Sequence, residues 1–385
     1  MARVQEQVEH HYHSSLVERV RGEGSVLVTG NTTIRLAKQF GFCYGVERAI
    51  DLAYAARKVF PEARLFLIGE IIHNPEVNAQ IAALGIRNLL DASGRPHVED
   101  LGSEDVVIVP AFGATVALIE EIKQHGCRIV DTTCGDVMSV WKRVRQNASE
   151  EVTSIIHGKA SHEETRATAS RALGKGNGHY LVVLNIEETE RVCDYILGKG
   201  TREEFFRDFA GRFSEGFDPD LHLQRIGVAN QTTMLREETE TVQRKLREAL
   251  TARDDSDDNF RLFDTICGAT QERQDALKEL LGRPLDLLLV VGGYNSSNTT
   301  HLAEMGEQKV PTYFIRNHGC LETPGLIRHF DLHLKEETSS QLPWLPEIGQ
   351  QAQIGITAGA SCPNNLIEEV ILRVLALRGE TLPVA

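Results

Sequence analysis

The sequence lacks an apolar run long enough to cross a membrane. A spanning helix needs about 18–20 such residues, but the best run, Leu287 to Val291, is short and ends in Gly292-Gly293. The first thirty residues have no apolar core of a signal peptide, and they carry several glutamates, which transit peptides avoid. We therefore expect no membrane span and a cytoplasmic location.

An excess of positive charge is also missing. The 385 residues include 41 Lys+Arg and 55 Asp+Glu, which gives a net charge of −14. Binding to nucleic acid needs a basic face, so we expect no nucleic-acid partner. With 41% hydrophobic and 25% charged residues, the composition is that of an ordinary globular protein, and the length predicts two or three domains.

Cysteines are few, and none of them form a C-x-x-C pair. Seven is an odd number spread over a long chain, which excludes both a secreted disulfide framework and a zinc ribbon. We expect Cys127, Cys193 and Cys320 to be structural.

Three other cysteines, Cys43, Cys134 and Cys267, share one sequence context. Each follows a short apolar run that predicts a strand and precedes a predicted amphipathic helix, and D-T-x-C-G occurs twice, from Asp131 and from Asp264. The positive end of a helix dipole favours a thiolate. Three thiolates aimed at one point suit an iron–sulfur cluster and leave one iron of four open. The alternative is that all three are small buried residues at tight turns.

Small polar residues follow three further predicted strands. Gly292–Asn298, Thr357–Ser361 and Asn230–Thr233 each come directly after an apolar run, and the first two precede a helix. Hydroxyl and amide groups at a helix N-terminus can bind phosphate beside free backbone N–H groups. They can equally be plain helix caps.

Histidines also occur at predicted strand ends, at His73 and His157. His162 and Glu164 lie two residues apart in the loop after His157, so they could supply a phosphate donor and a proton donor. The alternative is that these histidines cap or pack, and that Glu164 belongs to a solvated helix start.

Taken together, these motifs resemble the IspH/LytB family of 4-hydroxy-3-methylbut-2-enyl diphosphate reductases, in particular its cyanobacterial and plant branch. The resemblance runs from about Ile34 to Leu375. It is carried, in order, by F-G-F-C-Y-G-V-E-R-A at Phe40, H-N-P at His73, A-F-G-A at Ala111, D-T-T-C at Asp131, H-G-K-A-S-H-E-E-T at His157, N-Q-T-T-M at Asn230, D-T-I-C-G-A-T-Q-E-R-Q-D-A at Asp264, G-G-Y-N-S-S-N at Gly292 and T-A-G-A-S at Thr357.

The resemblance implies an α/β fold of three similar units with mostly parallel sheets, in pseudo-threefold arrangement around a central iron–sulfur cluster. The implied boundaries are an N-terminal extension 1–33, a first unit 44–134, a second unit 135–266 with an insertion near 198–225, a third unit made of 34–43 and 267–375, and a C-terminal tail 376–385.

The implied activity is the last step of the non-mevalonate isoprenoid pathway. It is the reductive dehydroxylation of (E)-4-hydroxy-3-methylbut-2-enyl diphosphate to isopentenyl diphosphate and dimethylallyl diphosphate. The family uses a [4Fe-4S] cluster with an open iron. The implied electron donor is a low-potential carrier, either ferredoxin or flavodoxin. The resemblance to the cyanobacterial and plant branch favours ferredoxin.

The resemblance also assigns roles to residues of this sequence. It makes Cys43, Cys134 and Cys267 the cluster ligands, Glu164 the proton donor and Thr232 the hydroxyl that bonds the substrate oxygen. The implied contacts of the diphosphate and the substrate are His73, His162, Ser296, Ser297, Asn298 and Ser361.

The sequence departs from the family pattern in three places. Phe112 stands where many bacterial members have a second diphosphate-binding histidine, and Gly135-Asp136 follows Cys134 in place of proline and a bulky residue. Cys362 directly follows Ser361, and we expect it to be a bystander. An iron–sulfur hydro-lyase and a non-enzymatic phosphometabolite-binding or redox-sensing protein are the alternative functions.

Overall fold

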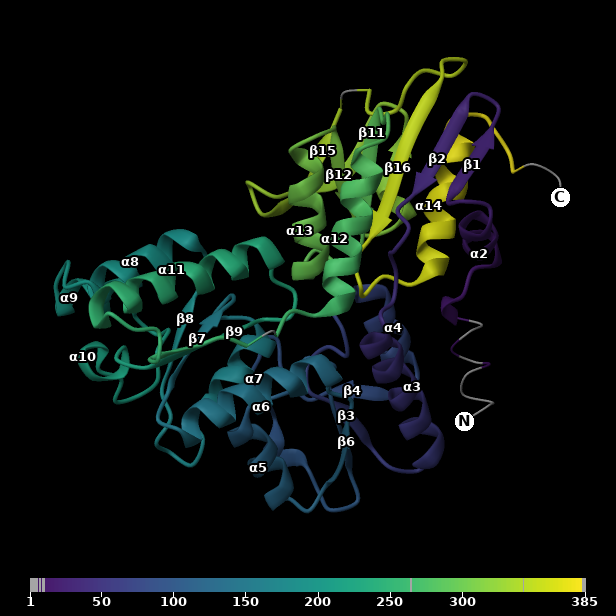
Figure 1. Ribbon diagram of the computed structural model, residues 1–385. Coiled ribbons are helices and arrows are strands. Elements are labelled where there is room, and N and C mark those ends of the chain that lie inside the picture. The colour runs from purple at the N-terminus through teal and green to yellow at the C-terminus, as the bar shows by residue number, and fades with distance from the viewer. Residues whose placement is uncertain (1–5, 7, 9–10, 264, 342, 383–385) are drawn as a thin grey trace. The chain divides into compact units, whose positions relative to one another are not determined.

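The computed structural model describes residues 6, 8, 11–263, 265–341 and 343–382 (Figure 1). The chain divides into two compact units. Unit 1 consists of the chain up to Val59, Ile72–Gly85 and the chain from Gly268 onward, and unit 2 of Phe60–Ile71 and Ile86–Cys267. Asp264 of the second D-T-x-C-G copy lies outside the described residues. None of the helices in the described ranges is long and apolar enough to cross a membrane.

Unit 1 contains one mixed sheet with the strand order β1-β2-β16-β11-β12-β14-β13, and β15 pairs with β14. Strands β2, β16, β11 and β12 run parallel, whereas β1 and the β13–β15 ribbon are antiparallel to their neighbours. The bounds are β1 Val26–Thr29, β2 Thr32–Leu36, β11 Leu287–Val291, β12 Thr312–Ile315, β13 Leu321–Thr323, β14 Leu326–Asp331, β15 Glu336–Ser340 and β16 Ala352–Ala358.

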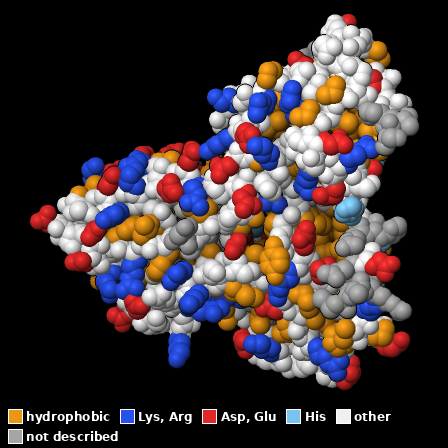
Figure 2. Space-filling view, turned by 45° about the vertical axis from the view of Figure 1, so that its right-hand side comes forward, with side chains coloured by type: hydrophobic (Ala, Val, Ile, Leu, Met, Phe, Trp, Pro, Cys, Tyr) orange, Lys and Arg blue, Asp and Glu red, His pale blue; other side chains and the backbone are white. Residues whose placement is uncertain are grey.

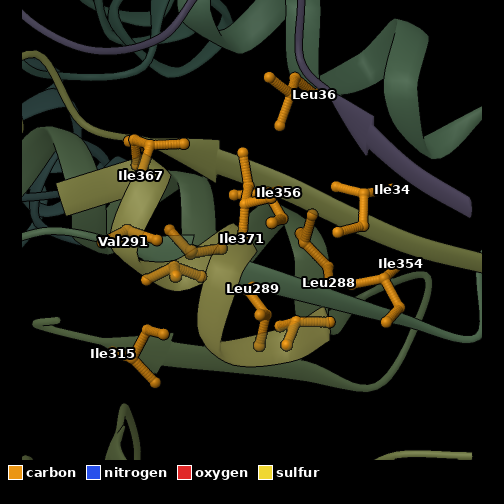
Figure 3. Close-up of a cluster of buried hydrophobic side chains, with 14 of the residues drawn as sticks. Ile34, Leu36, Leu288, Leu289, Val291, Ile315, Ile354, Ile356, Ile367 and Ile371 are labelled. Carbon is orange, nitrogen blue, oxygen red and sulfur yellow. The ribbon is translucent and has the colours of Figure 1, made fainter. Parts of the chain in front are cut away.

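The helices of unit 1 are α2 Ser15–Gly22, α3 Tyr44–Val59, α4 Pro75–Ala83, α12 Gly268–Leu281, α13 Ser297–Glu307, α14 Asn364–Leu377 and the 3-10 turn His318–Cys320. Four of them, α2, α12, α13 and α14, pack against strands of this sheet. The apolar run of β11 is buried along its whole length, as expected for a central parallel strand covered on both faces. Figure 3 shows Ile367 and Ile371 of α14 beside the side chains of β11 and β16, with Ile34 of β2 nearby in the same core.

Unit 2 contains two sheets, each of four parallel strands. Their orders are β10-β9-β7-β8 and β4-β3-β5-β6. The bounds are β3 Leu65–Leu67, β4 Ile86–Asn88, β5 Val106–Val109, β6 Arg128–Asp131, β7 Thr153–His157, β8 Tyr180–Val183, β9 Ile226–Asn230 and β10 Phe260–Arg261. The predicted α/β class with mostly parallel sheets is therefore confirmed, and the sheet of unit 1 is of mixed type.

The helices of unit 2 follow its strands in βα order. They are α5 Val116–Gln124, α6 Gly135–Ser149, α7 Glu163–Ala172, α8 Ile186–Ile196, α9 Arg202–Asp208, α10 Pro219–His222, α11 Arg236–Asp254 and the 3-10 turn Val98–Asp100. The charged segment around α9 is tied to the core, because Phe205, Phe209 and Phe217 are buried against β8 and β9. On the face drawn in Figure 2, acidic and basic side chains are interspersed.

Truncating the central strand of unit 1 tests this core. We expect Leu289→Ala to lower the free energy of unfolding by about 2–5 kcal/mol, because a fully buried leucine leaves a cavity. Leu334→Ala is the control: its side chain is 64% exposed, so the expected change is under about 0.5 kcal/mol. Urea titration followed by circular dichroism measures both, and equal effects would contradict the assigned core.

Candidate active site

The three cysteines of the repeated context all stand directly before a helix. Cys43 precedes α3, Cys134 is the N-cap residue of α6, and Cys267 precedes α12. Each is partly accessible and free of disulfides, whereas Cys320 and Cys362 are buried. The helix starts predicted from the sequence are thus confirmed.

Two arginines hold the chain just before Cys43. Arg273 of α12 donates from Nη2 to the carbonyl oxygen of Gly41 at 2.6 Å and from Nε at 3.3 Å. Arg21 of α2 donates to the carbonyl of Phe40 at 2.8 Å, and its guanidinium carbon lies 4.1 Å from the centre of the Phe40 ring. Consecutive carbonyls before the thiol therefore accept charge-assisted hydrogen bonds, which are stronger than neutral ones.

Unit 1 also gathers the small polar residues predicted to bind phosphate. Ser361 Oγ donates to the carbonyl of His73 at 3.2 Å and lies 3.5 Å from Oγ of Ser296, the N-cap residue of α13. Asn298 Oδ1 accepts from the N–H of Ala360 at 3.0 Å. Ser297 is the first residue of α13. We call His73, Ser296, Ser297, Asn298 and Ser361 the polar cradle.

Two glycines allow backbone segments of the polar cradle to approach neighbouring groups closely. A Cβ at Gly293 would lie 2.4 Å from the carbonyl oxygen of His73, and one at Gly359 would lie 2.0 Å from Thr299 Oγ1. The amide nitrogen Nδ2 of Asn298 is buried and has no hydrogen-bond partner among the described residues. Because a buried donor without a partner is costly, this atom indicates a ligand with an acceptor group.

The cradle is connected to the Cys43 loop. The N–H of Cys43 donates to the carbonyl of Ala360 at 3.2 Å. Ala360 precedes Ser361, and its own N–H donates to Asn298 Oδ1. Phosphate-type donors and one candidate cluster ligand are thus held by the same backbone segment of unit 1.

Unit 2 contains a buried carboxylate whose partner comes from a different strand–helix loop. Glu164, in the first turn of α7, is 3% exposed. Thr232, two residues after β9, donates to it from its backbone N–H at 2.6 Å and from Oγ1 at 2.9 Å. His162 caps α7, and its Nδ1 accepts from the N–H of Glu164 at 3.2 Å. In a neutral ring the proton then resides on Nε2, which makes that atom a donor.

Gln231 connects the two loops, a role that sequence reasoning missed. Its Oε1 accepts from the N–H of Lys159 and from Thr165 Oγ1, both at 3.1 Å, and its Nε2 donates to Thr233 Oγ1 at 2.7 Å. The signal was present in the N-Q-T-T-M motif, but the partners lie more than sixty positions away. His157 has a structural role, because its Nδ1 bonds Thr239 Oγ1 at 2.9 Å within the core.

Local hydrogen bonds shape the turn that presents Cys134. Asp131 Oδ1 accepts from the N–H of Thr133 at 2.9 Å and from its hydroxyl, and Cys134 N–H donates to Ala111 O at 2.8 Å. Gly113, at φ +79°, lies so close to Trp141 that a Cβ would be 2.3 Å from the indole. A Cβ at Gly135, the first residue of α6, meets nothing within 4 Å, so the packing does not require glycine at this position.

The other two departures from the family pattern are explained by their surroundings. Phe112 is buried and packs edge-on against His162, with ring centres 6.2 Å apart, so it supplies an apolar wall where a histidine would supply a donor. Cys362 is fully buried, and burial together with the carboxylates of Glu76 and Glu369 raises the pKa of its thiol. A thiol in this state is a poor metal ligand, which supports its role as a bystander.

The predicted site residues therefore fall into two sets. Unit 1 carries Cys43 with the polar cradle, and unit 2 carries Cys134, Cys267, His162, Glu164 and Thr232. Fold and side chains together define an α/β protein that presents thiols at helix starts, neutral phosphate donors and a buried carboxylate.

Comparison with known proteins identifies the family. The LytB protein family model matches residues 34–375, and the chain belongs to this family. It is 47% identical over 386 residues to a 4-hydroxy-3-methylbut-2-enyl diphosphate reductase of Gloeobacter violaceus, covering 98% of this chain and 91% of the relative. It is 45% identical to the enzyme of that name from Thermosynechococcus vestitus, covering 97% and 92%.

Two solved structures are similar. One is (E)-4-hydroxy-3-methyl-but-2-enyl diphosphate reductase, the terminal enzyme of the non-mevalonate pathway, with 25% identity, a TM-score of 0.54 and coverage of 90% of this chain and 99% of the other. The other is the E-1-hydroxy-2-methyl-but-2-enyl-4-diphosphate reductase of Plasmodium falciparum. It has 21% identity, a TM-score of 0.65 and coverage of 91% and 94%, and it supports the fold.

The hydrogen bonds from Arg273 to the chain before Cys43 can be tested by mutation. We expect Arg273→Gln to remove the charge-assisted bonds to Gly41 and to cost about 1.5–3 kcal/mol. Hydrogen exchange of residues 41–44 in the metal-free protein should accelerate. Arg283→Gln, an exposed arginine just after the same helix, is the control and should leave this exchange unchanged; acceleration in both variants would show a general loosening instead.

Proposed function

We propose that this chain is a reductase that removes the allylic hydroxyl of (E)-4-hydroxy-3-methylbut-2-enyl diphosphate and forms isopentenyl and dimethylallyl diphosphate. The substrate C–O bond is replaced by a C–H bond, two electrons and two protons are consumed, and water leaves. The observation that carries the proposal is the buried pair of Glu164 and Thr232 in a chain of the LytB family. This pair can deliver one of the protons that the reductive reaction consumes.

We assign Cys43, Cys134 and Cys267 as the ligands of a [4Fe-4S] cluster. The donor set fits this group, because iron–sulfur clusters prefer soft sulfur ligands and these three cysteines stand partly accessible at helix starts. Burial raises the pKa of Cys193 to about 12, so that thiol is a poor competitor. When bound, the cluster supplies low-potential electrons and an open iron with Lewis acidity toward the substrate hydroxyl.

The polar cradle is assigned to the diphosphate. Ser296, Ser297 and Ser361 offer hydroxyls, Asn298 offers its partnerless Nδ2, and the N-terminus of α13 adds its dipole. His73 and His162 are assigned as further donors to the substrate. Neutral donors suffice because several of them converge on one anion.

Glu164 and Thr232 are assigned to proton delivery. The hydroxyl of Thr232 and Oε2 of Glu164 are hydrogen-bonded at 2.9 Å. A protonated carboxyl group can give its proton to the substrate oxygen directly, or it can donate to the threonine hydroxyl while that hydroxyl gives its own proton to the substrate oxygen. Protonating the leaving oxygen lets it depart as water. Gln231 holds both loops and so fixes the distance between the carboxyl group and the hydroxyl.

Two further assignments complete the proposal. The electrons come from a small low-potential carrier, ferredoxin or flavodoxin, and the similarity to cyanobacterial relatives favours ferredoxin. We place the reaction in the cytoplasm.

Iron Mössbauer spectroscopy of the anaerobically purified protein tests the ligand assignment. We expect a four-iron cluster with one distinct iron whose signal moves when the substrate is added. Cys134→Ser should lose most of the cluster, whereas Cys193→Ser, a half-buried thiol of α8, should keep it. Four equivalent irons that ignore the substrate would contradict the open site and point to a fourth protein ligand.

Removing the proton donor should slow the chemical step. We expect Glu164→Gln to lower kcat by about 10²- to 10⁴-fold with little change in KM, since a positioned acid contributes about that much. The cluster spectrum should be unchanged. Glu187→Gln, which alters an exposed carboxylate of α8, is the control.

Thr232 can be tested in the same assay. Thr232→Ser keeps the hydroxyl and should keep most of the activity, whereas Thr232→Val should lose it. Equal activity of the serine and valine variants would refute the role of the hydroxyl.

A further inference from the structure

Unit 2 has a hollow whose eleven lining residues include four basic ones and none of the residues assigned to chemistry. It has a volume of about 780 Å³ and lies among α5, α6, α7 and the turn after α7. Lys123, Arg145, Arg171 and Lys175 line it, with Glu120 as the acidic residue of the lining. We call this feature the basic hollow. In a protein with a net charge of −14, it is a local concentration of positive charge.

The charges of the basic hollow are arranged in two layers. Lys123, Arg145 and Lys175 are exposed. Lys123 also forms an ion pair with Glu120 at 2.7 Å. Arg171 is buried beneath them, where it donates to the carbonyls of Ala114 at 2.7 Å and Ala167 at 2.8 Å. Burial, together with the charge of Arg145, lowers the pKa of Arg171 to about 10, so it remains cationic near neutral pH.

An aromatic ring connects the basic hollow to a candidate cluster ligand. The guanidinium of Arg171 stacks on Trp141, with its central carbon 3.2 Å from the ring centre. The indole N–H of Trp141 donates to Thr168 Oγ1 at 3.2 Å, which fixes the ring. Trp141, Val137 and Ala167 form a buried cluster against which Cys134 packs. One face of this tryptophan thus stacks on Arg171, which lines the hollow, and Cys134 packs against the cluster that contains the tryptophan.

This arrangement fits the need of the proposed reaction for an external electron source. A reductase of this kind receives electrons from a carrier that must come close to the cluster and then leave. Two net-negative proteins repel each other except where one presents a positive patch, which also steers encounter. Exposed lysines suit such a contact because their charges remain hydrated and the complex stays short-lived.

Another basic hollow lacks this connection. It is formed in unit 1 by Arg35, Lys38 and Arg283 with Glu279. Lys38 pairs with Glu279 at 2.6 Å. Among the described residues, neither arginine of that hollow makes a cation–π contact like that of Arg171 with Trp141.

Resting on the function proposed above, we propose that the basic hollow is the docking site of a small acidic one-electron carrier protein. Each encounter oxidises one reduced carrier by one electron and reduces this protein by one electron, so two encounters support one turnover. The two protons and the departing water belong to the reaction at the substrate. Lys123, Arg145 and Lys175 bind the carrier, and Arg171 with Trp141 forms the packed connection toward Cys134.

The test uses the holoprotein and a plant-type [2Fe-2S] ferredoxin with an acidic surface as the probe. Lys123→Glu combined with Lys175→Glu should weaken ferredoxin binding, measured by calorimetry, and lower kcat/KM for reduced ferredoxin, each by about tenfold or more at low salt. Turnover driven by reduced methyl viologen should be unchanged. The control is Lys199→Glu with Lys309→Glu, two exposed lysines that produce the same change in net charge.

The outcomes separate the docking site from the reductase function. Wild-type affinity for ferredoxin should also fall with ionic strength, and less steeply in the Lys123/Lys175 variant. Equal losses in both double variants would assign the effect to net charge and overturn the docking site, as would unchanged ferredoxin binding in the Lys123/Lys175 variant.

Two additional results complete the test. If methyl viologen drives no turnover in the wild type, the reductase function fails, while the calorimetric comparison still decides where ferredoxin binds. If the glutamate variant unfolds, Lys123→Gln with Lys175→Gln replaces it, with a smaller expected loss because charge is removed and not reversed.

Discussion

The contact between Thr232 and the buried carboxyl group of Glu164 is the interaction on which the proposed chemistry depends. A carboxylate that is 3% exposed loses most of its hydration, and two short hydrogen bonds from one residue replace part of it. The backbone donor cannot rotate away, so the side chain of Glu164 is held in one orientation before any substrate arrives. Gln231 then joins the loops that carry the two residues. Preorganisation of this kind is cheaper than ordering the groups during the reaction.

Several loops of the site are closely packed, because glycine backbones approach other groups more closely than any side chain would allow. Gly293 lies against the carbonyl of His73, Gly359 against Thr299, and Gly113 against Trp141. The Cys43 loop is held in a different way, because Arg21 and Arg273 donate charge-assisted hydrogen bonds to the consecutive carbonyls of residues 40 and 41. Both devices leave the ends of strands and the starts of helices with few alternative conformations. Ligands can then bind without a large cost in ordering the chain.

The sequence was informative about local features and much less about distant ones. Apolar runs followed by cysteine or by small polar residues correctly predicted the strands and the helix starts at Cys134, Ser297 and Asn364, because such signals lie within a few residues of each other. The antiparallel β13–β15 ribbon was not predicted although its strands are neighbours in the sequence, because β14 and β15 carry many polar and charged residues and lack an apolar run. Gln231 and Arg273 were missed as well. Their partners are more than sixty and more than two hundred positions away, and no local pattern encodes such contacts.

The two proposed binding sites use positive charge in opposite ways, although both are assigned to an anionic partner. At the polar cradle, hydroxyls, an amide and a helix N-terminus supply partial positive charge without lysine or arginine. Neutral donors lose less hydration than cations when they are enclosed, and in the proposed function their geometry holds the diphosphate. At the basic hollow, full charges stay exposed and hydrated, so their field extends into solvent but their grip is weak. A substrate that must be fixed and a carrier that must leave call for these opposite solutions, which is why net charge alone is a poor guide to what this protein binds.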